Sequence, residues 1–103
     1  MLGRFEEAVL LALIHFKGQA TIGDLYDALD EHKIPRSFGA IYTVLDRMLA
    51  KRFVTRRKGE PLPIRGKKAR YIYRITNGGR AAITEAQKAR AVWGNTAGRS
   101  VAR

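Results

Sequence analysis

The chain has 103 residues, 46% of them hydrophobic, which is enough for one domain with a buried core. Lys and Arg number 20 against 9 Asp and Glu, so the formal net charge is +11, and an imbalance of this size informs on partners and solubility. The sequence contains no cysteine, which excludes disulfides, thiolate zinc sites and cysteine nucleophiles.

The positive charge is concentrated in the second half of the sequence. Residues 1–46 carry 4 basic and 7 acidic side chains, whereas residues 51–74 carry 10 basic side chains and one acidic one. A positive field confined to one segment favours nucleic acid as the partner. The longest apolar run, residues 8–14, is far shorter than the roughly 20 residues that span a bilayer, and no stretch resembles a signal peptide. We therefore expect a cytoplasmic protein with no membrane partner.

Residues 1–16 are predicted to form a helix. Phe5, Val9, Leu13 and Phe16 recur at helical spacing, and two glutamates lie in the first turns, where the helix dipole favours acids. Further apolar residues widen the hydrophobic surface beyond one stripe, and such a helix is usually buried on more than one side. Two interpretations stay open: a central core helix, or a helix whose second face helps to form a dimer interface.

A second helix is predicted to begin at Thr21, after a break at residues 17–20. The Thr21 hydroxyl offers an N-cap, and Asp24 takes the position of its capping-box partner. Acidic residues cover the outer side of this helix. Because phosphate repels them, we place the helix behind the one that contacts the partner. Its apolar face consists of Ile22, Leu25, Tyr26 and Leu29.

A third helix is predicted after Pro35, which stops the second, and Ser37 is suited to cap it. One side is apolar, and the other is small, polar and uncluttered, as in a helix that enters the major groove of DNA. The alternative is an ordinary solvated face. The apolar side comprises Ile41, Val44, Leu45, Met48 and Leu49, and the opposite side comprises Ser37, Ala40, Thr43 and Arg47, with Tyr42 and Asp46 beside them.

Two strands and a basic loop follow. Residues 53–57 have the β-branched and aromatic content of a short strand, and residues 69–75 alternate as a second one. The intervening residues 59–68 are too rich in Gly and Pro for regular structure. Three helices followed by a two-stranded basic wing predict a mainly α fold with a small antiparallel β wing, a winged helix-turn-helix with an extra C-terminal helix.

The last predicted helix covers residues 77–93, capped by Thr76. Gly78 and Gly79 in its first turn weaken it by roughly 1 kcal/mol each relative to Ala. Its apolar residues are mostly alanine, so it needs a partner surface. Residues 94–103 show no period and are predicted to be disordered. The chain is thus divided into a winged-helix DNA-binding domain (1–75), a dimerisation helix (76–93) and a disordered tail (94–103).

The motif Ser37-x-Gly39-x-Ile41-Tyr42-x-x-Leu45-x-Arg47-Met48, a basic wing, and then Tyr71-x-Tyr73-Arg74-Ile75-Thr76-x-x-Gly79 resemble the PadR family of bacterial transcriptional regulators, in its short-chain subset. The resemblance covers roughly residues 2–93. It implies a homodimer, usually a repressor, that binds a two-fold operator. The fourth helix would then pack against the partner's first helix, and helix 37–51 and the wing 56–72 would contact DNA.

These considerations define two sets of candidate residues. Base readout is assigned to the front of the third helix, and phosphate contacts to cations and a tyrosine around it. The predicted DNA-binding residues are Arg36, Ser37, Phe38, Ala40, Tyr42, Thr43, Arg47, Lys51, Arg65, Lys67, Lys68 and Arg70. The predicted dimer interface consists of Phe5, Val9, Leu13, Ile83, Ala86 and Trp93.

The sequence also bears on functions other than DNA binding. Neither His15 nor His32 has neighbours that suggest a triad or a metal site, so we expect no enzyme activity, metal or cofactor. A basic winged helix can also bind structured RNA or a protein partner, since fold alone does not settle function. A flat aromatic effector at the dimer interface is a further possibility. Its cavity would be lined by Trp93, Phe5, Phe16 and Tyr26, although these aromatic residues can equally pack the core.

Overall fold

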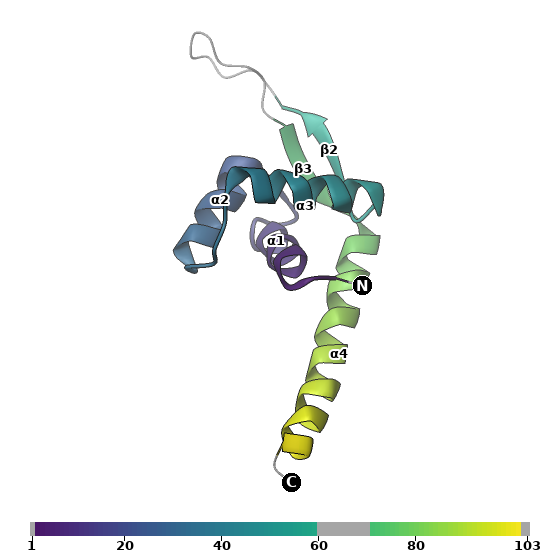
Figure 1. Cartoon of the computed structure of the whole chain (residues 1–103). Helices are drawn as coiled ribbons and strands as arrows, with labels where there is room; N and C mark the ends of the chain where they lie inside the picture. The colour runs from purple at the N-terminus through teal and green to yellow at the C-terminus, as the bar shows by residue number, and fades with distance from the viewer. Residues whose placement is uncertain (1, 60–70, 102–103) are drawn as a thin grey trace.

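Helices make up most of the computed structural model, which describes residues 2–59 and 71–101, with side chains as far as Trp93. The elements run α1 (Arg4–His15), β1 (Gln19–Thr21), α2 (Ile22–Glu31), α3 (Phe38–Ala50), β2 (Val54–Lys58), β3 (Tyr71–Ile75) and α4 (Asn77–Val101). The first three helices pack together, the β2–β3 hairpin projects from one side of them, and α4 extends away from the opposite side (Figure 1). The predicted fold class, mainly α with a small antiparallel wing, is confirmed.

Helix α1 lies at the centre of the core. Val9, Leu10 and Leu13 are fully buried within the chain, and Ile83 of α4 is 3% exposed. Val9, Leu13 and Ile83, which were predicted for the dimer interface, lie in the hydrophobic core of the single chain. The rest of the core consists of Ala12, Ala20, Leu25, Ala28, Leu29, Ile41, Val44, Leu45, Met48, Val54, Tyr73 and Ile75.

The local signals for α2 and α3 act as predicted. The Thr21 hydroxyl accepts a hydrogen bond from the Asp24 N–H at 3.2 Å, and the Asp24 carboxylate accepts one from the Thr21 N–H at 3.1 Å. The Ser37 hydroxyl likewise accepts from the Ala40 N–H at 3.0 Å and begins α3. Each cap satisfies a backbone N–H that a helix start would otherwise leave unpaired.

The sheet has three strands, where two were predicted. Strand β3 lies in the middle, with β1 and β2 antiparallel on its two sides, and the register pairs Ala20 with Tyr73 and Arg56 with Tyr73. Strand β1 falls in the segment that was predicted only as a break. The chain reaches it through Gly18, whose φ of +98° suits a residue without a side chain, and whose carbonyl accepts the Ile75 N–H at 2.9 Å.

Helix α4 begins where predicted and ends later. The Thr76 hydroxyl accepts the Gly79 N–H at 3.0 Å and donates to the Arg52 carbonyl at 2.7 Å. The helix then continues to Val101, so the prediction of a disordered tail from residue 94 is corrected as far as residue 101. Once the first turn is fixed, each further residue adds one hydrogen bond, and no proline interrupts the run. Residues 102–103 lie outside the described part.

None of the helices in the described ranges 2–59 and 71–101 has the length and hydropathy of a membrane span.

Candidate nucleic-acid interface

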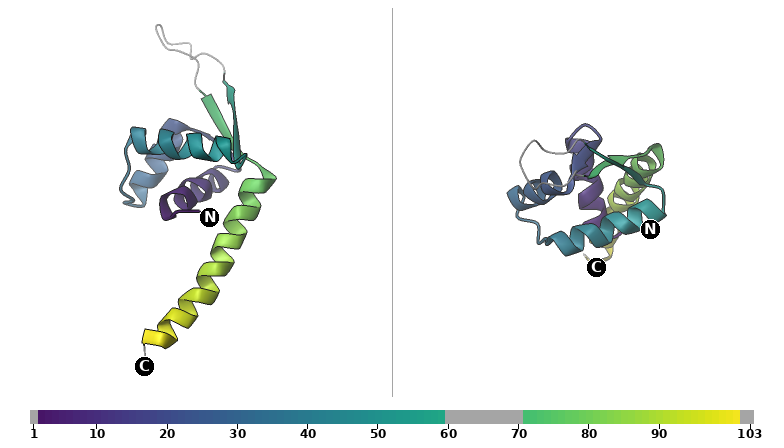
Figure 2. Two further views of the ribbon diagram at one scale, coloured as in Figure 1. Left: turned by 45° about the vertical axis from the view of Figure 1, so that its right-hand side comes forward. Right: turned by 90° about the horizontal axis from the view of Figure 1, so that it is seen from above.

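The outward side of α3 is exposed along its whole length. Its buried stripe faces α1 and α2, and seen from above the helix lies along one edge of the molecule (Figure 2). Residues seven apart lie above one another on a helix, so Gly39 and Asp46 mark the middle of the outward side, opposite the stripe. Thr43 lies beside them, and its hydroxyl donates to the Gly39 carbonyl at 2.9 Å. The centre of this surface is therefore small and polar.

Two clefts border this central strip. On one side Phe38 and Tyr42, which are 47% and 48% exposed, line a cleft of about 550 Å³ together with the start of α2 and Tyr71 of β3. On the other side Ala40, Thr43 and Arg47 line a cleft of about 440 Å³ with the first turn of α1. The predicted base-reading residues thus share one exposed helix but belong to its two rims. Gly39 and Asp46, which lie between the rims, are absent from the predicted set.

An aromatic cluster supports the start of α3. The rings of Tyr26 and Phe38 stack with centroids 4.3 Å apart, and the Arg36 guanidinium lies 4.9 Å from the Tyr26 centroid. Arg36 also pairs with Asp30. The Arg36 side chain, which was predicted to contact a phosphate, is therefore already held by two partners within the chain. Its Nε is buried without a hydrogen bond.

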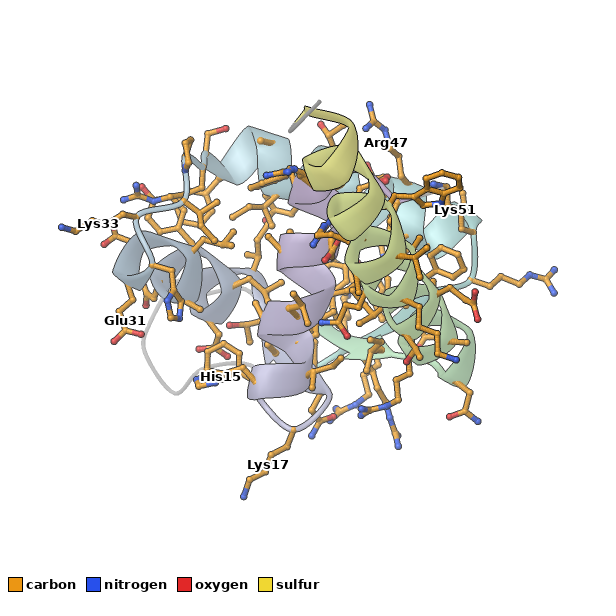
Figure 3. All side chains as sticks on the ribbon, turned by 90° about the horizontal axis from the view of Figure 1, so that it is seen from below. His15, Lys17, Glu31, Lys33, Arg47 and Lys51 are labelled. Atoms are coloured by element: carbon orange, nitrogen blue, oxygen red, sulfur yellow. The ribbon has the colours of Figure 1, made fainter. Side chains whose placement is uncertain are left out.

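The C-terminal half of α3 carries two cations with different surroundings. Lys51 lies 3.6 Å from the Glu6 carboxylate, which neutralises part of its charge. Arg47 is exposed and has no ion pair within the described residues. Figure 3 shows both at the same end of the molecule, with Arg47 pointing away from the ribbon. Arg47 is accordingly the cation of α3 best placed to contact an outside anion.

The hairpin adds four exposed cations that the predicted residue set did not include. Arg56, Arg57 and Lys58 follow one another on β2, and Arg74 lies on β3. The Arg56 guanidinium sits 4.6 Å from the Tyr71 centroid, and the hydrogen bond with Tyr73 raises the pKa of Arg56. The run Arg-Arg-Lys in a strand was the available signal, because residues 55–58 have no apolar alternation and so expose both faces of the strand. The predicted wing cations Arg65, Lys67, Lys68 and Arg70 lie outside the described residues.

The predicted dimer residues that remain accessible line two apolar grooves beside α4. A groove of about 730 Å³ includes Phe5 and Leu11 of α1 with Ile34 and Pro35. A second, of about 720 Å³, includes Ala86 and Trp93, and Trp93 is 68% exposed.

The four aromatic residues predicted for an effector cavity do not meet within one chain. Phe5 and Trp93 line different grooves, and Tyr26 stacks on Phe38. Phe16 lies edge-on to His15, with ring centroids 5.2 Å apart.

The exposed helix α3, the projecting cationic β2–β3 hairpin and the packing of the first three helices together define a winged helix-turn-helix protein. No group of acidic or histidine side chains within the described ranges could hold a metal ion. The transcriptional regulator PadR-like family matches residues 10–85, and the chain belongs to this family. Its members are transcriptional regulators, so the expectation that the chain is not an enzyme is confirmed.

Solved structures share the fold at low sequence identity. A PadR family regulator from Clostridium difficile is 16% identical with a TM-score of 0.79, covering 96% of this chain and 99% of that one. A PadR family regulator from Eggerthella lenta is 22% identical with a TM-score of 0.79, covering 95% and 84%. Bacillus subtilis PadR in complex with operator DNA is 22% identical with a TM-score of 0.66, covering 81% of this chain and 46% of that one. A search of curated proteins returned no match.

Proposed function

We propose that the chain is a homodimeric repressor that binds a two-fold operator in double-stranded DNA through α3 and the β2–β3 hairpin. Residues 1–75 would form the DNA-binding domain, and α4 the dimerisation element. In the dimer the two α3 helices would lie about 34 Å apart, the separation of successive major grooves. Repression is the role that the resemblance implies, since a bound dimer obstructs polymerase.

The observation that carries the proposal is the shape of the outward side of α3. Gly39 lies at its centre, and a Cβ added there would meet no atom within 4 Å apart from its chain neighbours and the backbone of its own helix. Packing inside the protein therefore gives no reason for a glycine in this helix. A surface that must approach the edges of base pairs closely does give one. The exposed cations beside it, Arg47, Arg56 and Arg57, suit the phosphates on either side.

The homodimer is supported by the second half of α4. The helix packs through Ile83 and Arg90 and then continues to Val101, away from the three-helix body (Figure 1). An alanine-rich helix of this kind gains stability from a partner surface. The exposed Trp93 and the grooves beside Phe5 and Ala86 offer apolar area that a second copy can cover. A flat aromatic effector between the two copies stays a prediction.

Structured RNA is the runner-up partner, and the geometry of α3 favours DNA. The major groove of an A-form RNA duplex is too deep and narrow for side chains to read, whereas that of B-DNA admits a helix. Selection from a pool of random duplex DNA, with an equal mass of structured RNA in a parallel arm at physiological salt, tests the choice. We expect the DNA arm to return a palindrome. Retention on RNA with no enriched DNA sequence would reject the proposal.

Replacing Gly39 by alanine should separate folding from DNA binding. The added methyl group clashes with nothing in the chain and removes the entropic cost of a helical glycine, so the free energy of unfolding should rise by up to about 0.5–1 kcal/mol. Affinity for the selected operator should nevertheless fall by about tenfold or more, because the methyl group obstructs a base edge. Thermal unfolding and fluorescence anisotropy measure the two effects.

Gly78→Ala is the matched control, since Gly78 takes the same second position in α4 and a Cβ there makes only ordinary contacts of 3.5 Å or more. It should leave operator affinity unchanged. A Gly39→Ala variant that binds the operator as tightly as the wild type would remove this part of α3 from the interface.

A further inference from the structure

Two neighbouring glutamates at the start of α1 are buried although they carry charge. Glu6 is 7% exposed and Glu7 is 3% exposed. A carboxylate out of water needs partners that compensate for its lost hydration. Glu6 accepts the Gly3 N–H at 2.7 Å and lies 3.6 Å from the Lys51 ammonium. Glu7 turns to the other side and pairs with Arg90.

The Glu7–Arg90 ion pair is bidentate. One guanidinium nitrogen of Arg90 donates to Oε1 of Glu7 at 2.6 Å, and the second donates to Oε2. Two parallel bonds fix the direction of both side chains as well as their separation. The hydrogen bonds that Arg90 donates to Glu7 also raise the pKa of Arg90. The pair joins residues 83 positions apart and so connects the first turn of α1 to the middle of α4.

Close packing does not fix the direction of α4 in the turns around Arg90. The helix is anchored at its start, where Thr76 bonds to Arg52 and Ile83 enters the core. Arg90 follows seven residues later, about 10 Å further along the axis. Around it small side chains of α4, such as Ala86 and Ala89, border the groove of about 720 Å³, and Glu7 and Arg90 line both this groove and the one of about 730 Å³. A helix held only at its start can pivot, so the ion pair supplies the second fixed point.

The same turn of α1 is also connected to the recognition helix. Glu6 contacts Lys51, the residue that ends α3, while Glu7 contacts α4. The relative orientation of α3 and α4 is therefore defined through two consecutive residues. Figure 1 shows α1 beneath α3 and to the left of α4.

We infer that the Glu7–Arg90 ion pair fixes the angle of α4 against the DNA-binding body and thereby sets the half-site spacing that the dimer accepts. The inference rests on the proposed homodimer. Because α4 would carry the dimer contacts, a small change in its angle moves the two α3 helices relative to each other. One extra base pair both lengthens and rotates the target, so a rigid dimer discriminates sharply between spacings. Glu7 and Arg90 are positioning residues in this scheme.

Two variants and two readouts test the inference. Arg90→Lys keeps the charge but loses the paired bonds, and Glu7→Leu with Arg90→Met replaces the pair without leaving a buried charge. The absence of native cysteine allows spin labels at Thr55→Cys and Ala91→Cys, diluted with unlabelled protein, to report the angle of α4 within one chain. Operator variants whose half-site spacing differs by one base pair report the spacing preference.

The wild type should give a narrow label distance and prefer its best spacing by about tenfold over the neighbouring ones. Both variants should broaden the distance and reduce the preference to less than about threefold. Lys88→Met, which removes a positive charge at an exposed position of α4 outside the ion pair, should change neither. An unchanged label distance, or an equal loss of affinity at every spacing, overturns the inference. If the wild type selects no two-fold site, the proposed homodimer fails, while the label distance still decides whether the pair positions α4.

Discussion

Gly79→Ala should destabilise the fold by about 3 kcal/mol or more, in the range expected for overpacking a backbone contact. A Cβ at this position would lie 2.3 Å from the Phe53 carbonyl oxygen and 2.7 Å from Cγ1 of Ile75. The Phe53 carbonyl belongs to the main chain. Its oxygen also accepts the Thr76 N–H at 2.9 Å. The start of α4 must therefore move away from the sheet. Urea unfolding monitored by circular dichroism measures the loss.

The adjacent glycine provides the control for this prediction. Gly78→Ala places its methyl group at ordinary contact distances from Thr76, Arg52 and Phe53, so it should change the free energy of unfolding by less than about 1 kcal/mol. Two alanine substitutions one residue apart should thus differ by several kilocalories per mole. Equal effects of the two would mean that the close approach of α4 to Phe53 does not contribute to the fold.

Gly79 also illustrates what the sequence conveyed and what it did not. The sequence predicted the start of α4 and its Thr76 cap, because capping depends on residues three positions apart. It marked Gly79 as a weak point in a helix. The reason for the glycine is its close approach to Phe53, which lies in the segment between α3 and β2, and no local pattern contains that information. The β1 strand was missed on similar grounds, since three residues are too few for an alternating pattern and pair with β3 more than fifty residues later.

The division of α1 between core and interface could not be read from its periodicity. Its apolar residues surround more than half of the helix, which is consistent with a buried position or with a second copy. The structure assigns Val9 and Leu13 to the core and leaves Leu11 38% exposed. The glutamates gave a partial signal: their place in the first turn was explained by the helix dipole, whereas the Arg90 partner comes from the far end of the sequence.

Helix α3 was predicted more completely than any other element. Its cap, its buried stripe and its exposed side all follow from local spacing and agree with the structure. The division of the exposed side into two rims does not follow, because it depends on the neighbouring α2, β3 and the start of α1. Which of these residues contact DNA stays a prediction.

Trp93→Glu should dissociate the proposed homodimer and with it most of the operator affinity. Trp93 is 68% exposed, so the substitution removes little from the fold of one chain. A buried tryptophan at the centre of an interface contributes about 2–4 kcal/mol. In a symmetric dimer the substitution occurs twice, so the dimer dissociation constant should rise by about a thousandfold or more. Sedimentation over a concentration series measures this constant, and anisotropy with the selected operator measures the loss of binding.

Ala91→Glu is the matched control, because Ala91 lies in the same turn of α4 on the side away from the groove that contains Ala86 and Trp93. It adds the same charge to the same helix and should leave the dimer intact. If both variants dissociate the dimer, added charge on α4 and not the lost indole is responsible. If neither does, the two copies meet elsewhere, and the exposed apolar side of α1 around Phe5 and Leu11 is then the surface to change next. The proposed homodimer predicts a further distinction. Trp93→Glu should leave binding to a single half-site unchanged, because α3 and the hairpin are untouched, whereas Gly39→Ala should weaken half-site and full operator alike.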